Sequence, residues 1–360
     1  MKVLHLPTYT GGQAWGLAQG ERSLGLDSKV LVRNSEWLGY ACDIDLGLDK
    51  ISSPFAKFTK LTKTFFQIRN KYDIFHFNFG SSLFHSPQNH LNHLELPFYP
   101  KQAKLFATYN GCDIRQKYIT MQRTAIAACH NSTCYNGQCN SGKLDELRLK
   151  GIIKMQKYVQ HIWAVNPDLL YFLPPHMSSF LPYSISLDGV AVNLPKLERK
   201  KIKIIHAPTN RAAKGSDYIF KAIAKLEKTH AEYFDFSVIE NIPHAQALQL
   251  YQDADLVIDQ ILIGWYGGFA VEVMAMGKPV IARIAPEDLH FLPLQMAKEV
   301  QEAVINADPI SILTVLKQCI EDRKLLQNHA NASIEYARKW HHPQYVASLT
   351  KEKYESYSSK

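Results

Sequence analysis

The stretch that decides the fold is residues 258–280, which read IDQILIGWYGGFAVEVMAMGKPV. A short apolar strand comes first, a helix begins near Phe269, and the loop between them contains Gly264, Gly267 and Gly268. Glycines let a ligand approach the backbone, and the N–H groups at a helix N-terminus favour phosphate oxygens. The pattern therefore predicts a phosphate-binding turn. Its alternative is a tight strand-to-helix turn without a ligand.

Glu272 lies about one turn into the helix that starts near Phe269. A carboxylate in this place can accept two hydrogen bonds from a ribose diol, as acidic residues do in other nucleotide-binding folds. An exposed glutamate on a surface helix is the competing interpretation.

A second loop of the same kind spans residues 205–216, between an apolar strand and a helical pattern. Arg211 and Lys214 stand three residues apart near the helix start, where an arginine fork and a lysine point charge can clamp a diphosphate. A solvated basic loop is the alternative. Both loops follow strands of one α/β series, and ligands gather at the carboxyl ends of such strands.

Strands and helices alternate in two series along the chain. We expect strands at 2–6, 29–32, 74–77, 103–108 and 161–165, then at 202–206, 234–240, 256–259 and 279–282. Such alternation predicts parallel sheets built from βαβ units. We predict two Rossmann-like α/β domains with a cleft between them, at 1–185 and 198–338. Residues 183–200 form the linker, and a C-terminal helix at 339–360 crosses back to the first domain.

Composition narrows the class of protein. The chain has 360 residues, 46% of them hydrophobic and 21% charged, which is ordinary for a globular protein and excludes a disordered or fibrous chain. The net charge of +8 suits an anionic partner. The sequence shows no signal peptide and no apolar run of about 18 residues, so we expect a cytoplasmic protein, peripheral at the inner face of the membrane.

Residues 205–283 carry a family resemblance. The Arg211–Lys214 segment, the glycine loop with Glu272 and the Met-Ala-x-Gly-x-Pro-Val run at 274–280 resemble GT-B glycosyltransferases of the glycosyltransferase family 4 type. The N-terminal Gly11-Gly12 loop is similar as well. The resemblance covers nearly the whole chain and is weaker in its N-terminal half.

The resemblance implies a retaining enzyme that moves a sugar from a nucleotide-diphosphate donor to a hydroxyl of a glycan or lipid-linked acceptor, in cell-surface polysaccharide synthesis. It implies no protein nucleophile and no cofactor for catalysis, with Arg211 and Lys214 as leaving-group stabilisers. Cationic side chains lower such a barrier by meeting the charge that develops on the leaving group. The implied donor-binding residues are Gly11, Gly12, Asn110, Arg211, Lys214, Gly267, Gly268, Phe269 and Glu272.

The chain departs from the family pattern at three places. Gly264 stands where a first glutamate is common, and the arginine precedes the lysine by three positions rather than five. Asn110-Gly111 replaces a His-Gly pair, so Asn110 can bond a sugar hydroxyl but cannot do acid–base work. Nearby, Asp113 and Arg115 either bind the acceptor or pair with each other to fix the loop.

The six cysteines lie in a chain without a signal peptide, so reduced thiols or metal ligands are expected. Cys129, Cys134 and Cys139 follow one another with four residues between, and Cys112 is a fourth candidate. Zinc sites commonly have two to four residues between cysteines. A structural zinc site in an insertion at 112–142 and thiols without metal remain the two alternatives.

Residues 55–72 contain four lysines and an arginine but no acidic residue. Phe58, Leu61, Phe65 and Ile68 form one helical stripe, which we expect to pack on the first domain, while the lysines attract an anionic lipid or a polyprenyl-diphosphate acceptor.

Two other functions stay open. A nucleotide-sugar epimerase of the same architecture would need carboxylates and histidines converging on the sugar. A non-enzymatic nucleic-acid-binding protein would explain the charge, but no helix-turn-helix, zinc-finger or RNA-binding signature supports it, so we expect no nucleic-acid partner.

Overall fold

The computed structural model of the chain describes residues 1–35, 39–89, 91–186 and 189–358. The chain forms two compact units. Unit 1 contains Met1–Gln116, Lys143–Ser186 and His342–Lys360, and unit 2 contains Lys117–Gly142 and Leu187–His341. The predicted linker at 183–200 includes residues 187 and 188, which lie outside the described residues.

Unit 1 is built on a parallel sheet of seven strands in the order β3-β2-β1-β4-β5-β6-β7. The strands are β1 (Lys2–Leu6), β2 (Asp27–Val32), β3 (Ile44–Asp45), β4 (Ile74–Asn78), β5 (Lys104–Tyr109), β6 (His161–Ala164) and β7 (Ser178–Phe180). The strand order reverses between β1 and β4, and loops at such a switch point form ligand sites in open α/β sheets.

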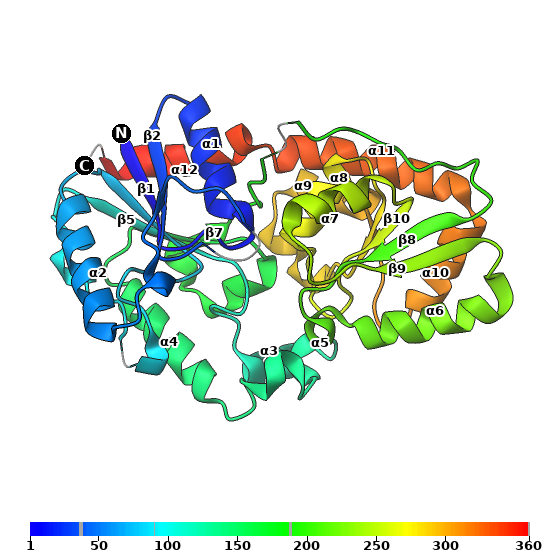
Figure 1. Cartoon of the computed structure of the whole chain (residues 1–360), viewed down its shortest axis with the longest axis horizontal. Coiled ribbons are helices and arrows are strands. Elements are labelled where there is room, and N and C mark those ends of the chain that lie inside the picture. The colour runs from blue at the N-terminus through cyan, green and yellow to red at the C-terminus, as the bar shows by residue number, and fades with distance from the viewer. Residues whose placement is uncertain (36–38, 90, 187–188, 359–360) are drawn as a thin grey trace. The chain divides into compact units, whose positions relative to one another are not determined.

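Alternating side chains divide the unit 1 core into two layers. Leu4, Leu6 and Phe75 cluster with Phe65 of α2 (Pro54–Ile68) and with residues of α4 (Lys143–Met155). The intervening residues, among them Val3, cluster instead with α1 (Gln13–Ser23) and α12 (Pro343–Ser358). Figure 1 shows α1 and α12 together on one side of this sheet. A period of two along each strand therefore fixes which helices cover which face.

Two glycines in α1 permit its close packing. A Cβ on Gly16 would lie 2.0 Å from the Ser184 carbonyl oxygen, and one on Gly20 would lie 2.0 Å from that of Pro343. No larger residue fits at either position without displacing backbone. The start of α12 therefore packs closely against α1 because Gly20 has no side chain.

Unit 2 has a parallel sheet of five strands in the order β12-β11-β10-β8-β9. The strands are β8 (Ile202–His206), β9 (Phe234–Val238), β10 (Leu256–Ile258), β11 (Val280–Ala282) and β12 (Val304–Asn306). In chain order this is the flavodoxin-like arrangement 2-1-3-4-5, whose switch point lies between the first and third strands. Here those strands are β8 and β10.

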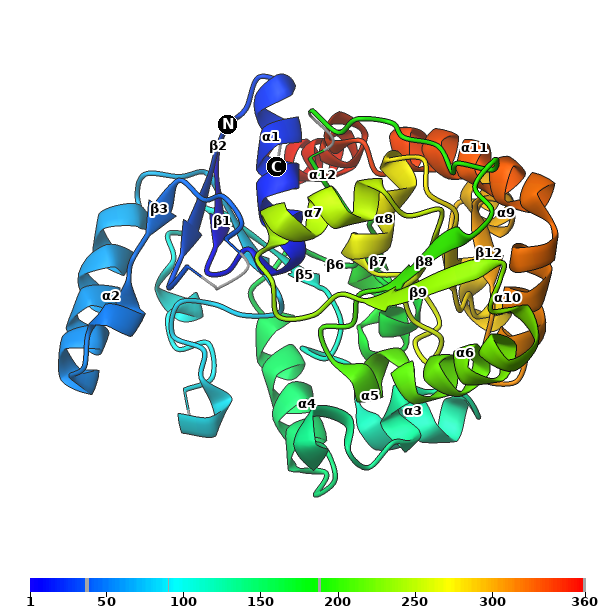
Figure 2. The same ribbon diagram turned by 45° about the vertical axis from the view of Figure 1, so that its right-hand side comes forward.

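Helices cover both faces of the unit 2 sheet. On one side, α6 (Ser216–His230) and α10 (Ile312–Glu321) pack together; on the other, α8 (Gly268–Ala275) and α9 (Leu294–Ala303) contact α11 (Arg323–Trp340) (Figure 2). The remaining helices of this unit are α3 (Lys117–Arg123), α5 (Arg211–Lys214) and α7 (His244–Gln252). None of the described helices combines the length and apolarity needed to cross a bilayer.

The segment at 112–142 is divided differently from the predicted domains. Residues 112–142 were expected as an insertion of the first domain, whereas Lys117–Gly142 belongs to unit 2. The Ala128 N–H donates to the Leu262 carbonyl at 3.2 Å, and Arg283 donates to the Ile126 carbonyl at 3.0 Å. These contacts join residues that are more than 130 positions apart in the chain, so no local sequence pattern predicts them. The C-terminal helix α12 belongs to unit 1.

Candidate active site

The loops after β8 and β10 converge at the switch point of the unit 2 sheet. After β8, Asn210 caps the short helix α5, accepting a hydrogen bond from the Ala213 N–H at 2.9 Å. Gly215 then turns the chain into α6 with a φ of 81°, and a Cβ there would lie 2.7 Å from Ile261 of the other loop. Glycine is required at this turn by both its backbone conformation and the close approach of the β10 loop.

Lys214 reaches the loop that follows β10. Its Nζ forms an ion pair with the carboxylate of Asp259, which is fully buried directly after the strand. The other Asp259 oxygen accepts a hydrogen bond from the Gly267 N–H at 2.8 Å, at the N-cap of α8. The lysine also lies 5.5 Å from the centre of the Phe269 ring. One carboxylate therefore fixes both the cation and the start of the helix that the glycine loop precedes.

Arg211 is the more exposed of the two predicted cations. Its guanidinium makes a bidentate pair with Glu240, with N–O distances of 2.9 and 2.6 Å, and lies 5.4 Å from the Phe220 ring centre. The hydrogen bonds from Arg211 hold the pKa of Glu240 below its usual value. The side chain of Arg211 is 56% exposed, so an incoming anion can reach it by competing with Glu240.

Glu272 is buried on α8 and accepts a hydrogen bond from Nε2 of His244, 2.8 Å away at the start of α7. That hydrogen bond raises the pKa of His244 above its usual value. The rings of Tyr251 and Phe269 join the same two helices, with centroids 4.8 Å apart. Among the described residues, the second oxygen of Glu272 accepts no hydrogen bond.

The predicted glycines serve different purposes. Gly267 is extended, with φ −96° and ψ 173°, and a Cβ there would lie 3.6 Å from Asp259, an ordinary contact. A Cβ on Gly264 would lie 2.6 Å from Cβ of Ala285. Gly264 is therefore needed for packing within unit 2. Gly268 is the first residue of α8.

The remaining predicted donor and acceptor residues lie in unit 1. Gly11 and Gly12 follow β1 with φ of 66° and 72°, and Gly12 is the N-cap of α1. After β5, Asp113 accepts hydrogen bonds from the N–H groups of Asn110 and Gly111, at 2.9 and 2.6 Å. The amide oxygen of Asn110 is buried and accepts no hydrogen bond within the described part of the chain.

Arg115 pairs with a residue that sequence reasoning did not single out for this role. Its guanidinium donates to both oxygens of Asp168, at 2.7 and 3.0 Å, and both side chains are buried. Asp168 lies in the 3₁₀ helix Pro167–Phe172 after β6. The alternative of a mutual Asp113–Arg115 pair is thus replaced by a bridge between the β5 and β6 loops, because the Asp113 carboxylate caps its own loop.

The cysteines are not among the groups of three or more possible metal ligands that the described residues bring together. Cys112 belongs to unit 1 and is exposed, whereas Cys129, Cys134 and Cys139 belong to unit 2 and are half-buried. Over the part of the chain that the structure describes, the one group of three or more possible ligands within 4.8 Å is His5, Glu21 and His76. The geometry gives the zinc site no support, and it stays a prediction that metal analysis decides.

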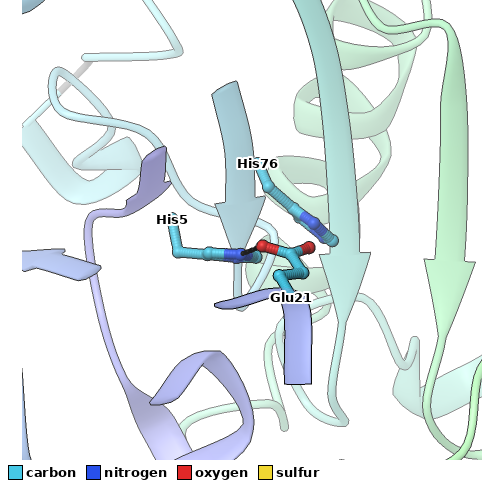
Figure 3. A group of neighbouring side chains, drawn as sticks. All are labelled: His5, Glu21 and His76. Atoms are coloured by element: carbon cyan, nitrogen blue, oxygen red, sulfur yellow. Dashed lines mark hydrogen bonds and ion pairs between the residues drawn. The ribbon is translucent and has the colours of Figure 1, made fainter. Parts of the chain in front are cut away.

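The His5, Glu21 and His76 group lies wholly buried between β1, α1 and β4 (Figure 3). Glu21 accepts hydrogen bonds from His5 at 2.8 Å and from the Tyr354 hydroxyl of α12 at 3.1 Å. The two ring nitrogens of His76 bond the hydroxyls of Tyr354 and Thr108, each at 2.6 Å. Hydrogen bonds already occupy both His76 nitrogens. We therefore interpret this group as a buried hydrogen-bond network that holds α12 in unit 1 rather than as a metal centre.

Three residues of the unit 2 site escaped sequence reasoning as functional residues: Glu240, His244 and Asp259. Asp259 directly follows β10, Glu240 lies two residues after β9, and His244 is the first residue of α7. These are positions where parallel α/β sheets place functional groups. Those positions were the available signal. Their partners lie 28 to 45 residues away, so the pairs themselves could not be foreseen.

Solved structures with the same two-unit architecture match the entire chain. One match is a sucrose-phosphate synthase from Thermosynechococcus elongatus, with a TM-score of 0.63, 12% identity and 100% of both chains covered. The chain has the GT-B fold. Anabaena HepE in complex with UDP-glucose gives a TM-score of 0.63 at 12% identity, covering 99% of this chain and 100% of that one.

Other solved structures with this GT-B fold widen the comparison. Arabidopsis thaliana starch synthase IV bound to ADP and acarbose gives a TM-score of 0.61 at 11% identity over 100% of both chains. A protein from Listeria monocytogenes assigned as a UDP-N-acetylglucosamine 2-epimerase gives 0.52 at 12% identity, over 99% of this chain and 96% of that one. No protein-family model and no curated protein matches the sequence. The resemblance to GT-B glycosyltransferases therefore holds for the fold over the full length of the chain.

Proposed function

We propose that the protein is a retaining glycosyltransferase that uses a nucleotide-diphosphate sugar as donor and a hydroxyl of a glycan or lipid-linked acceptor. The observation that carries the proposal is the grouping of Arg211, Lys214, Glu272 and the start of α8 at the switch point of the unit 2 sheet. The solved structures of this fold that hold UDP-glucose and ADP support a nucleotide at this kind of site.

Each residue has a distinct task in this proposal. The diphosphate lies at the N-terminus of α8, where the helix dipole and the N–H groups of Gly268 and Phe269 favour negative charge. Arg211 exchanges Glu240 for a phosphate oxygen, and Lys214 remains held by Asp259. The second oxygen of Glu272 accepts hydrogen bonds from both hydroxyls of the ribose. Positive charge that is already in place stabilises the departing nucleoside diphosphate, with no metal or protein nucleophile assigned.

A nucleotide-sugar epimerase remains the competing enzyme, because one matched structure of this fold is assigned that activity. An epimerase converts its donor without an acceptor. In unit 2, Glu272 and His244 are already paired with each other, as are Lys214 and Asp259. Because these groups would bind a nucleotide in either enzyme, release of the nucleotide is the observation that distinguishes the two.

We further propose that α2 attaches the protein peripherally to an anionic membrane surface, which places it at the cytoplasmic face. Phe65 and Ile68 pack into the core, but Phe55 is 80% exposed and Phe66 is 62% exposed. Exposed lysines lie beside them on a helix without acidic residues. Exposed aromatic rings flanked by lysines fit the boundary between lipid headgroups and acyl chains.

A donor panel tests the enzymatic proposal. The purified protein is incubated with UDP-, GDP-, ADP- and CMP-sugars, and thermal stability and nucleotide release are measured. We expect one nucleotide to raise the melting temperature and its sugar to be hydrolysed slowly without an acceptor. Conversion of the donor to an epimer without nucleotide release would favour the epimerase. A panel with no stabilisation and no release would refute the donor assignment.

A further inference from the structure

Unit 1 contains a cavity of about 420 Å³ that the donor site does not use. It lies at the carboxyl ends of β2, β4 and β5 and is walled by α4, with Arg33, His85, His93 and Asp113 in its lining. The volume falls within the range of roughly 300–1,000 Å³ that is typical of small-molecule sites. Its position after three parallel strands is where open α/β sheets bind ligands.

Arg33 is the first sign of what this cavity binds. Its guanidinium donates to the His85 carbonyl oxygen at 3.0 Å and to the Ser81 hydroxyl at 3.3 Å. Within the described residues it forms no ion pair with a carboxylate, and burial lowers its pKa. The carboxyl of Glu95 acts on Arg33 without forming an ion pair, and it raises the pKa of Arg33 less than burial lowers it. A cation that is partly removed from water without a paired carboxylate is costly to maintain, and an anionic ligand offsets that cost.

Two stacked imidazoles are the second sign. The rings of His85 and His93 lie 3.8 Å apart at an interplanar angle of 10°. His93 is fully buried and bonds the Ser82 hydroxyl through Nδ1 at 3.0 Å, and its Nε2 has no hydrogen-bond partner among the described residues. Nδ1 of His85 is also buried, and no described residue forms a hydrogen bond with it. Burial lowers the pKa of His85 to about 4 and that of His93 to about 2, so both rings are neutral near pH 7.

The other charged groups of the lining already have hydrogen-bond or ion-pair partners of their own. The oxygens of Asp113 accept from two backbone N–H groups of their own loop, and burial raises its pKa to about 6. Arg148 of α4 lies 3.2 Å from Asp145, one turn away. Neutral imidazoles each offer one donor and one acceptor, which suits sugar hydroxyls. One desolvated cation beside them suits a single negative group.

We propose that this cavity binds an anionic saccharide, with its carboxylate or phosphate against Arg33 and its hydroxyls bonded to His85 and His93. The statement that this saccharide is the acceptor rests on the proposed function. The statement that the cavity binds it is independent of the proposed function.

Isothermal titration of the full chain tests the proposal with four probes: glucuronate, glucose 6-phosphate, glucose and inorganic phosphate. We expect at least one of the two anionic saccharides to bind about tenfold or more tightly than glucose and than inorganic phosphate. The first two probes distinguish a carboxylate from a phosphate. Equal affinity for glucose and both anionic saccharides would overturn the charge requirement. Inorganic phosphate binding as tightly as glucose 6-phosphate would overturn the saccharide requirement.

Variants then assign the preference to Arg33. Arg33→Gln should remove the tenfold preference while leaving nucleotide binding unchanged, and Arg33→Lys should keep part of it. Lys101→Gln, which removes an exposed charge from the same unit, is the matched control and should change nothing. An Arg33→Gln protein that is folded by circular dichroism and retains the preference contradicts the assignment. Saccharide binding without any nucleotide binding would refute the donor proposal and leave this one intact.

Discussion

His244 donates a hydrogen bond from Nε2 to Oε1 of Glu272, 2.8 Å away. The bond ties the first residue of α7 to the middle of α8 and orients a carboxylate that follows the glycine loop. It therefore positions the group to which we assign the ribose. A side chain already held in place loses little further freedom when a ligand binds it.

Glu272→Ala should weaken nucleotide binding by about 100-fold, because two hydrogen bonds from ribose hydroxyls to a carboxylate are lost, at about 1.5 kcal/mol each. Titration calorimetry with the nucleotide chosen by the donor panel measures the loss. His244→Gln keeps the carboxylate and should have a clearly smaller effect. Unchanged affinity in Glu272→Ala would refute the ribose assignment.

The His244–Glu272 pair should stabilise the fold more at low pH than at high pH. The pKa of His244 is raised in the folded protein, so folding takes up protons. The stabilisation is fully present below the unfolded value of about 6.5 and is lost as the pH rises through the raised folded value. The free energies of unfolding of the native protein and of His244→Gln are measured in urea at pH 6 and pH 9. They should differ by about 1 kcal/mol at pH 6 and by less at pH 9. An equal difference at both pH values would exclude a charged pair.

Lys214→Met should destabilise the protein as well as weaken donor binding. It leaves the fully buried Asp259 without its cation, which costs about 3 kcal/mol in comparable buried pairs. Combining it with Asp259→Asn removes the uncompensated charge and should restore most of the free energy of unfolding measured in urea. Donor turnover should stay low in both proteins. Recovery of turnover in the double variant would show that Lys214 acts through stability alone.

Arg211 should behave differently, because it is exposed and its partner lies at the surface. Arg211→Gln should change the melting temperature little, as exposed ion pairs contribute little to stability. It should nonetheless lower donor affinity. Glu240→Gln releases the guanidinium and should leave donor affinity unchanged or higher. If both variants lower donor affinity equally, donor binding requires the intact ion pair rather than the arginine alone.

Vesicle flotation should show that the protein binds anionic lipid through α2. We expect binding to vesicles containing phosphatidylglycerol and none to pure phosphatidylcholine. Substituting Lys60→Gln together with Lys63→Gln should weaken vesicle binding by roughly 30-fold, because each lost charge contributes about 1 kcal/mol. Lys225→Gln with Lys228→Gln removes the same charge from unit 2 and serves as control. Equal loss in both double variants would indicate general electrostatic attraction rather than a surface formed by α2.

Local patterns of this sequence determined the strands, the glycine turns and the α/β class. Apolar runs such as Lys2–Leu6 and Ile202–His206 have to be buried, and turn residues bound them, so their positions follow from a few neighbouring residues. The same reasoning placed Arg211, Lys214 and Glu272 on elements that follow strands. Charge and spacing were sufficient for that, because parallel strands bring their carboxyl ends to one edge.

Tertiary structure alone decided which partners these side chains have. Asp259 meets Lys214 across 45 residues, and Arg115 meets Asp168 across 53. Packing likewise drew Lys117–Gly142 into unit 2, so Cys112 and the other three cysteines belong to different units. The partner of a buried charge is whichever group folding brings within hydrogen-bond reach. The sequence by itself therefore showed where functional groups stand, and the fold determined what holds them and which remain open to a ligand.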